Sequence, residues 1–126
     1  MNRPVHFEIH AGDPASLSKF YADVFGWKVT HLPQLDYWMF ETGDGAGING
    51  GMVQRMGPRP AETAAVNGFV CSLGVASVDD ALARALAAGA TVALPKMAIP
   101  GVGYQAYVKD PDQNILGLHQ ADAAAR

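Results

Sequence analysis

The chain has one cysteine, few basic residues and no long apolar run, and each shortage excludes a class of protein. The single cysteine, Cys71, cannot form a disulfide within the chain and suits a reducing compartment. No apolar stretch approaches the roughly 18 residues that a membrane span needs. Only 9 Lys and Arg residues are present and they are scattered, so a clustered basic surface for nucleic acid is missing. We therefore predict a cytoplasmic protein that has neither nucleic acid nor membrane as a partner.

What the chain does contain is enough apolar material for a packed core. Hydrophobic residues make up 49% of its 126 residues, and that length is typical of one domain. We predict a single domain over residues 1–126. It is made of module 1 at about residues 4–54 and module 2 at about residues 66–120.

Module 1 begins with a strand pattern followed by a helix pattern. Polar and apolar side chains alternate along residues 4–10, with Val5, Phe7 and Ile9 on one face and His6, Glu8 and His10 on the other. Asp13 is a suitable helix N-cap, residues 14–25 carry apolar side chains at helical spacing, and Gly26 ends the pattern. Three further strands are expected at residues 27–31, 37–42 and 48–54.

Module 2 repeats this order after a linker at residues 55–65. A strand is expected at residues 68–75, a helix from the Ser77 cap to Gly89, and three strands at residues 91–94, 102–108 and 114–120. Residues 97–103 are expected to form a mobile loop. At an offset of 63 residues Gly26 matches Gly89, and His6 matches Phe69. The pattern predicts an α+β fold of two tandem β-α-β-β-β modules.

Two stretches resemble a known family. The first is HFEIHAGDP at residues 6–14, continued by Phe20-Tyr21 and by VFGWKV at residues 24–29; the second is YVKDPDQN at residues 107–114, ending in GLH at 117–119. Together they resemble the vicinal oxygen chelate superfamily of glyoxalases, bleomycin-resistance proteins and extradiol dioxygenases. The closest branch is that of bacterial enzymes related to lactoylglutathione lyase. The resemblance implies concave mixed sheets around a central cavity for a small molecule, and often a homodimer, paired side by side or by exchange of modules.

The resemblance also implies a divalent metal in some members. Its ligands are one residue from the first strand of each module and one carboxylate late in each sheet. His6 falls on the first position, whereas the other three expected positions, Phe69, Gly50 and Gly117, are non-ligating. We therefore expect no four-ligand metal cofactor and keep His6 only as a residual ligand. A displaced site of His6, Glu8 and His119 is the alternative, although residues two apart on a strand are awkward joint ligands.

The same residues could work without a metal. A carboxylate beside an imidazole makes an acid–base pair, so His6, Glu8 and His119 are the predicted catalytic residues. They could equally be a solvated strand face. Seven further residues are candidates for substrate binding: His10, Trp38, Phe40, Phe69, Cys71, Tyr104 and Tyr107. Alternation leaves open whether Trp38 and Phe40 or Tyr37 and Met39 face inward, and Cys71 is expected to be buried.

Two functions remain open on the sequence. The chain could be a lyase or isomerase acting on a small carbonyl compound, related to lactoylglutathione lyase but with the usual four-ligand metal site degenerate. It could instead sequester a drug or an aromatic metabolite, as bleomycin-resistance proteins do. A third, weaker alternative is an accessory domain that associates with another chain.

Overall fold

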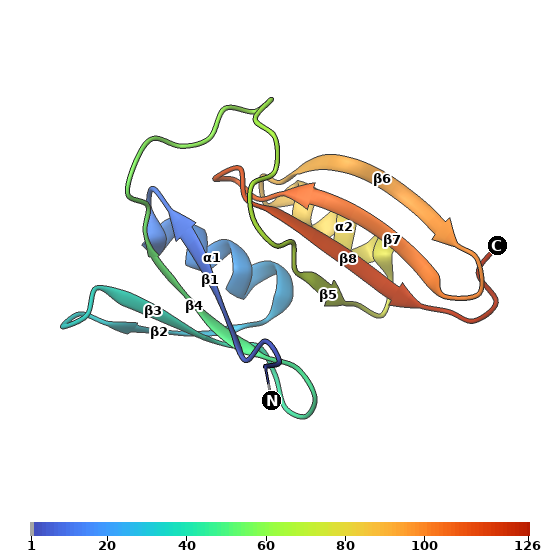
Figure 1. Ribbon diagram of the computed structural model, residues 1–126, viewed down its shortest axis with the longest axis horizontal. Helices are drawn as coiled ribbons and strands as arrows, with labels where there is room; N and C mark the ends of the chain where they lie inside the picture. Colours follow the sequence, from blue (N-terminus) through green and yellow to red (C-terminus); the bar gives the residue numbers. More distant parts are fainter. Residues whose placement is uncertain (1) are drawn as a thin grey trace. The chain divides into compact units, whose positions relative to one another are not determined.

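The computed structural model describes residues 2–126, and these form two compact units (Figure 1). Unit 1 extends to Arg59, and unit 2 is Pro60–Arg126. Unit 1 consists of β1 (His6–Ala11), α1 (Pro14–Phe25), β2 (Lys28–Leu32), β3 (Tyr37–Glu41) and β4 (Asn49–Gln54). Unit 2 consists of β5 (Ser72–Gly74), α2 (Val78–Ala87), β6 (Thr91–Ile99), β7 (Gly103–Lys109) and β8 (Ile115–Ala121). The repeated β-α-β-β-β order confirms the predicted α+β fold.

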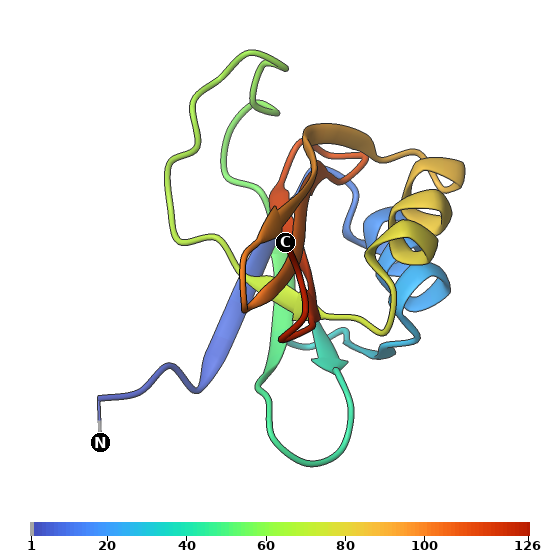
Figure 2. The same cartoon turned by 90° about the vertical axis from the view of Figure 1, so that its right-hand side faces the viewer.

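Each unit has one four-stranded mixed sheet with the same strand order. The order is β1-β4-β3-β2 in unit 1 and β5-β8-β7-β6 in unit 2. The first strand of each unit pairs in parallel with the last, and the other pairs are antiparallel. In each unit the helix covers one face of its own sheet (Figure 2). The opposite face of each sheet is therefore not covered by the helix of its own unit.

Both helices begin at the predicted caps. The Asp13 side chain accepts from the Ser16 backbone N–H, and the Ser77 side chain accepts from that of Asp80. Such caps satisfy backbone donors that have no partner inside the helix. Gly26 ends α1 in the left-handed conformation that glycine adopts without a Cβ clash. Neither helix in residues 2–126 has the length and apolar character that crossing a bilayer requires.

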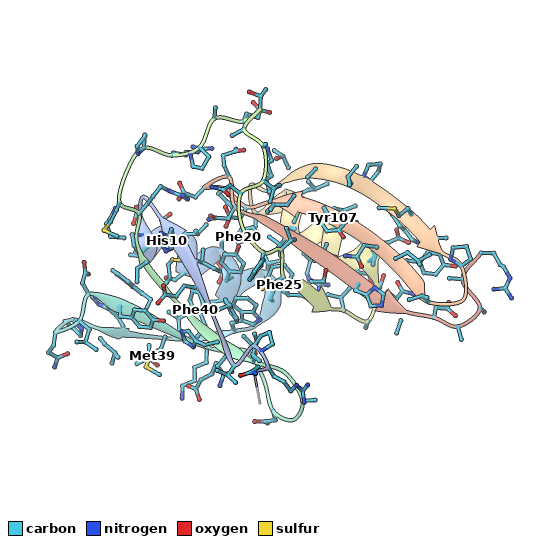
Figure 3. All side chains as sticks on the ribbon, in the orientation of Figure 1. His10, Phe20, Phe25, Met39, Phe40 and Tyr107 are labelled. Carbon is cyan, nitrogen blue, oxygen red and sulfur yellow. The ribbon has the colours of Figure 1, made fainter. Side chains whose placement is uncertain are left out.

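The core of unit 1 is an aromatic cluster between α1 and the sheet. Phe20 and Phe25 of α1 lie with ring centroids 6.2 Å apart (Figure 3). Trp27 stacks on Tyr21 at 5.0 Å and contacts Phe40 of β3 at 5.4 Å. Phe40 is only 1% exposed. Large rings packed in this way supply most of the apolar burial in so small a unit.

Two expectations for unit 2 are wrong. The strand expected at residues 68–75 is only Ser72–Gly74. Residues 97–99, expected in a mobile loop, belong to β6 and pair with Gly103, Tyr104 and Gln105 of β7. The hairpin extends this far because the turn needs only residues 100–102, with Gly101 at a φ of 76°. The register shifts between Val92 and Met97 accommodate Pro95, which cannot donate to a ladder.

The repeat offset also changes along the chain. Asp13 and Ser77, the two N-caps, are 64 residues apart, whereas Gly26 and Gly89 after the helices are 63 apart. Because the second helix is shorter, the offset of 63 residues that relates the segments after the helices does not apply to the strands before the helices. With the corrected offset, the counterpart of His6 is Val70 and not Phe69. Neither side chain can bind a metal.

Candidate functional site

The polar face of unit 1 is the side of its sheet that points away from α1. Alternation along β1 turns Phe7 and Ile9 toward the helix, and turns His6, Glu8 and His10 to the opposite side. Strand pairing places Gly51 of β4 beside Glu8, and Met39 of β3 beside Gly51. We call the surface made by His6, Glu8, His10, Tyr37, Met39, Gly51 and Val53 the polar face of unit 1.

Tyr37 lies across this face and joins β3 to β1. β4 separates these two strands, and a Cβ on Gly51 would overlap the Tyr37 hydroxyl. Because Gly51 has no side chain, the Tyr37 ring crosses β4 and stacks beside the His6 imidazole, with centroids 6.4 Å apart. Glycine is therefore needed at position 51 because the Tyr37 side chain approaches the backbone closely, and not because the backbone adopts an unusual conformation.

Three polar groups meet at the end of the Tyr37 side chain. The hydroxyl lies 2.7 Å from His6 Nε2 and donates to Glu8 Oε2 at 3.4 Å. A phenol has one proton, so when that proton points to Glu8 the His6 Nε2–H donates to the Tyr37 oxygen. His10 Nε2 lies 3.9 Å from Glu8 Oε1, on the far side of the carboxylate. The face therefore holds a continuous path for a proton between an imidazole, a phenol and a carboxylate.

The surroundings of Tyr37 keep its hydroxyl protonated. Partial burial, followed by the charge of Glu8 and the hydrogen bond to it, raises the pKa of Tyr37 above its ordinary value of 10.0. All three causes favour the neutral phenol. At neutral pH Tyr37 therefore keeps its hydroxyl proton and can donate it in a hydrogen bond.

The metal site that the family resemblance implies does not fit these residues. By strand pairing Gly51 and Gly117 are equivalent positions: each lies beside the first strand of its unit and precedes a fully buried residue of its own strand. Gly51, one residue beyond the expected Gly50, shares the face of His6 but has no carboxylate, and the Tyr37 hydroxyl takes up the space. In residues 2–126 no three His, Cys, Asp or Glu side chains form a group that could hold a metal ion.

Unit 2 has a polar face of its own on the side of its sheet away from α2. Gln105 of β7 donates through Nε2 to Ser72 Oγ at 2.9 Å, and its Oε1 lies 2.8 Å from His119 Nδ1. Gly117 again provides the room, because a Cβ there would stand 2.6 Å from Gln105 Nε2 and would overlap Ser72 Oγ. Of the three predicted catalytic residues, His6 and Glu8 therefore share a cluster in unit 1, and His119 belongs to a cluster in unit 2.

Several predicted binding residues lie elsewhere. Phe40 packs in the core, and Trp38, on the same side of β3, stacks on His31 at 4.1 Å, so Tyr37 and Met39 occupy the polar face instead. Tyr104 has the Lys96 ammonium 4.7 Å above its ring. Of the remaining candidates, Tyr107 of β7 pairs with Gly117 of β8, whereas Phe69 and Cys71 are exposed. The expected burial of Cys71 is wrong because β5 begins only at Ser72.

Tyr37 and Gln105 are the residues that the sequence analysis missed as site members. Alternation in β3 allowed Tyr37 to face either way, and no pattern in β7 set Gln105 apart. The usable signal was one glycine in the last strand of each unit, Gly51 in β4 and Gly117 in β8. A missing side chain in a half-buried strand indicates that a neighbouring side chain crosses it.

Comparison with known proteins gives a consistent fold. The family model described as "Glyoxalase-like domain" matches residues 6–118. A glyoxalase/bleomycin resistance protein/dioxygenase family enzyme from Burkholderia phytofirmans is 23% identical over 93% of this chain and 97% of its own, with a TM-score of 0.71. A glyoxalase-related enzyme from Fulvimarina pelagi is 20% identical over 100% and 98%, with a TM-score of 0.72.

A third solved structure is that of a resistance protein. The fosfomycin resistance protein FosX from Listeria monocytogenes is 17% identical over 97% of this chain and 95% of its own, with a TM-score of 0.71. At these identities the likenesses show the fold and no more. A search of curated proteins gives no significant match.

Proposed function

We propose that this chain, which belongs to the glyoxalase-like domain family, binds a small carbonyl compound on the polar face of unit 1 and performs acid–base chemistry there. The observation that carries the proposal is the placement of the Tyr37 hydroxyl, 2.7 Å from His6 Nε2 and 3.4 Å from Glu8 Oε2. Tyr37, a proton donor, and Glu8, a proton acceptor, lie side by side, and the absence of a side chain on Gly51 leaves room for them. A strand face that is merely solvated would not require a hydroxyl placed between an imidazole and a carboxylate.

The chemistry follows from the three groups. Tyr37, held neutral, donates a hydrogen bond to the carbonyl oxygen of the bound compound. Glu8 accepts the proton from the adjacent carbon, and the electron pair of the broken C–H bond moves onto the oxygen, so that an enolate forms whose oxygen accepts the hydrogen bond from Tyr37. His6 Nε2–H donates to the Tyr37 oxygen and supports that hydrogen bond, and Glu8 returns a proton to the carbon in the reverse step. A positioned acid–base pair of this kind contributes about 10²–10⁴ in rate.

The experiment is proton exchange on a simple probe. Dihydroxyacetone is incubated with the protein in D₂O, and loss of its C–H signal is followed by NMR. We expect the protein to accelerate exchange, and Glu8→Gln to reduce that acceleration by about 10²-fold or more. His31→Gln is the matched control, because His31 is an exposed histidine of the same unit that stacks on Trp38 at a distance from this face. Equal exchange by the wild-type protein and Glu8→Gln would contradict the proposal.

Sequestration without turnover is the second candidate function. It is favoured by the apolar side chains that share the polar face, Met39 at 43% exposure and the half-buried Val53, which would cover a flat ligand. A sequestering protein would bind an aromatic ligand with an affinity that falls on Met39→Ala. It would show no accelerated exchange of any carbonyl probe. Measuring both carbonyl proton exchange and aromatic-ligand affinity therefore separates the two functions.

We also propose that the protein is a cytoplasmic homodimer. Support comes from β6, an edge strand of its sheet that exposes Leu94, Met97 and Ile99. Exposed apolar edge strands are usually covered. Light scattering on the purified protein tests the oligomeric state, and Met97→Glu should shift it toward the monomer.

A further inference from the structure

The polar face of unit 2 contains a chain of three side chains with a defined direction. Gln105 is 6% exposed and lies between Ser72 and His119. A buried amide must satisfy both its oxygen and its nitrogen, since an unpaired polar atom costs free energy in a dry environment. Its two partners stand at opposite ends of the amide, so the orientation of the amide decides what each partner does.

The orientation of the Gln105 amide determines which ring nitrogen of His119 is protonated. Gln105 Nε2 can only donate, and it donates to Ser72 Oγ at 2.9 Å. Gln105 Oε1 can only accept, and it lies 2.8 Å from His119 Nδ1. With the amide in this orientation, Nδ1 carries the hydrogen. A neutral imidazole has only one N–H, so Nε2 keeps its lone pair.

We propose that Gln105 is a positioning residue that fixes neutral His119 as the Nδ1–H tautomer and makes Nε2 the hydrogen-bond acceptor for a hydroxyl group of a bound molecule. His119 is half-buried, and no side chain within residues 2–126 pairs with Nε2. Both ring orientation and tautomer are set before any ligand arrives, which reduces the ordering cost of binding. In unit 2 the proposed site accepts a hydrogen bond from the ligand through His119 Nε2, whereas in unit 1 the Tyr37 hydroxyl donates one to the ligand. The inference does not depend on the chemistry proposed for unit 1.

Gly117 is what permits this arrangement. It pairs with Ser72 on one side and with Tyr107 on the other, and its missing Cβ leaves room for Gln105 Nε2 to reach Ser72. Gly51 plays the same part for Tyr37 in unit 1. Both halves of the repeat therefore have a glycine at this position, and a different polar side chain occupies the space beside it.

The test is the ¹⁵N NMR spectrum of the histidine rings, recorded at a pH where imidazole is neutral. We expect His119 Nε2 to show the shift of an unprotonated nitrogen and Nδ1 that of a protonated one. Gln105→Glu retains an acceptor for Nδ1–H and should preserve this tautomer. Gln105→Leu removes it and should increase the Nε2–H form. His31, in unit 1, is the internal control, since its spectrum should not change.

Two further measurements keep the proposal open to contradiction. If Gln105→Leu does not fold, Ser72→Ala replaces it, because it removes the group that orients the amide. Titration with phenol, a neutral hydroxyl donor, should move the His119 Nε2 resonance and should leave Nδ1 in place. Protonated Nε2 in the wild-type protein, a tautomer unchanged by Gln105→Leu or Ser72→Ala, or an Nε2 resonance that does not respond to phenol would each overturn the proposal.

Discussion

The Tyr37 hydroxyl fills the space that a side chain on Gly51 would take. Gly51→Ala therefore tests whether this glycine holds the polar face of unit 1 together. The added methyl group forces the Tyr37 side chain to move, and the contact with His6 should be lost. Because the displaced atom is the end of a side chain, we expect a small loss of stability together with a large change in the Tyr37 and His6 NMR signals. Gly74→Ala is the control, since a Cβ there meets nothing within 4 Å.

The raised pKa of Tyr37 predicts a stability change at alkaline pH. Below pH 10.0 the phenol is protonated in both the folded and the unfolded chain, so its contribution is fully present. As the pH rises through the folded pKa, the unfolded chain ionises first and the contribution is lost. Denaturant titrations should show a loss of stability above pH 10.0 that is smaller in Tyr37→Phe. A loss equal in the two proteins would contradict the assignment.

Glu8 should account for only part of this shift. Partial burial is its first cause, and the charge and hydrogen bond of Glu8 follow. Spectrophotometric titration of the phenols should therefore show a lower Tyr37 pKa in Glu8→Gln, yet one still above the ordinary value. Tyr37→Phe identifies which of the four tyrosine transitions is involved. A pKa that returns fully to the ordinary value would mean that burial has no part in the shift.

Phe40 should affect stability and not binding directly. Its ring is almost fully buried against Trp27 and Tyr21, so Phe40→Ala leaves a cavity and should cost about 3–5 kcal/mol. Phe69→Ala, at a fully exposed position, should change stability by less than about 0.5 kcal/mol. Chemical denaturation measures both. Similar costs for the two would contradict the placement of Phe40 in the core.

Asp110 should be the most sensitive acid of unit 2. It is 1% exposed, and its carboxylate accepts from the backbone of Asp112 and Asn114 and from the Asn114 side chain at 2.8–3.0 Å. Asp110→Ala leaves these donors without their acceptor and should cost at least about 1–3 kcal/mol. Asp44→Ala, in an exposed turn, should be nearly neutral. A neutral Asp110→Ala would show that the turn forms without this network.

Metal removal should leave the protein unchanged. Gly51 and Gly117 provide no carboxylate, and the His6 imidazole is engaged with Tyr37. Protein purified without a histidine tag should contain no stoichiometric transition metal, and dialysis against a chelator should not alter its thermal unfolding. One equivalent of metal that is lost in His6→Ala would contradict this view of the site.

The sequence predicted the elements well because their signals are local. Alternation in β1, the Asp13 and Ser77 caps and the repeated order each depend on neighbouring residues. The face of Tyr37 was not predictable in this way. It depends on how β3 pairs with β4, and both Tyr37 and Trp38 fit a half-buried strand. The extent of β6 was also missed, since Pro95 and Gly101 suggest a loop until the pairing with β7 is known.

The most direct test of the account is to map where a carbonyl compound binds. Amide and methyl NMR spectra of the wild-type protein would be recorded during titration with dihydroxyacetone, and again with Tyr37→Phe. We predict shifts concentrated at His6, Glu8, Met39 and Val53, and weaker binding in Tyr37→Phe. Shifts confined to the opposite side of the sheet, around His31 and Trp38, or binding unaffected by Tyr37→Phe, would contradict the claim that this polar face is the functional site.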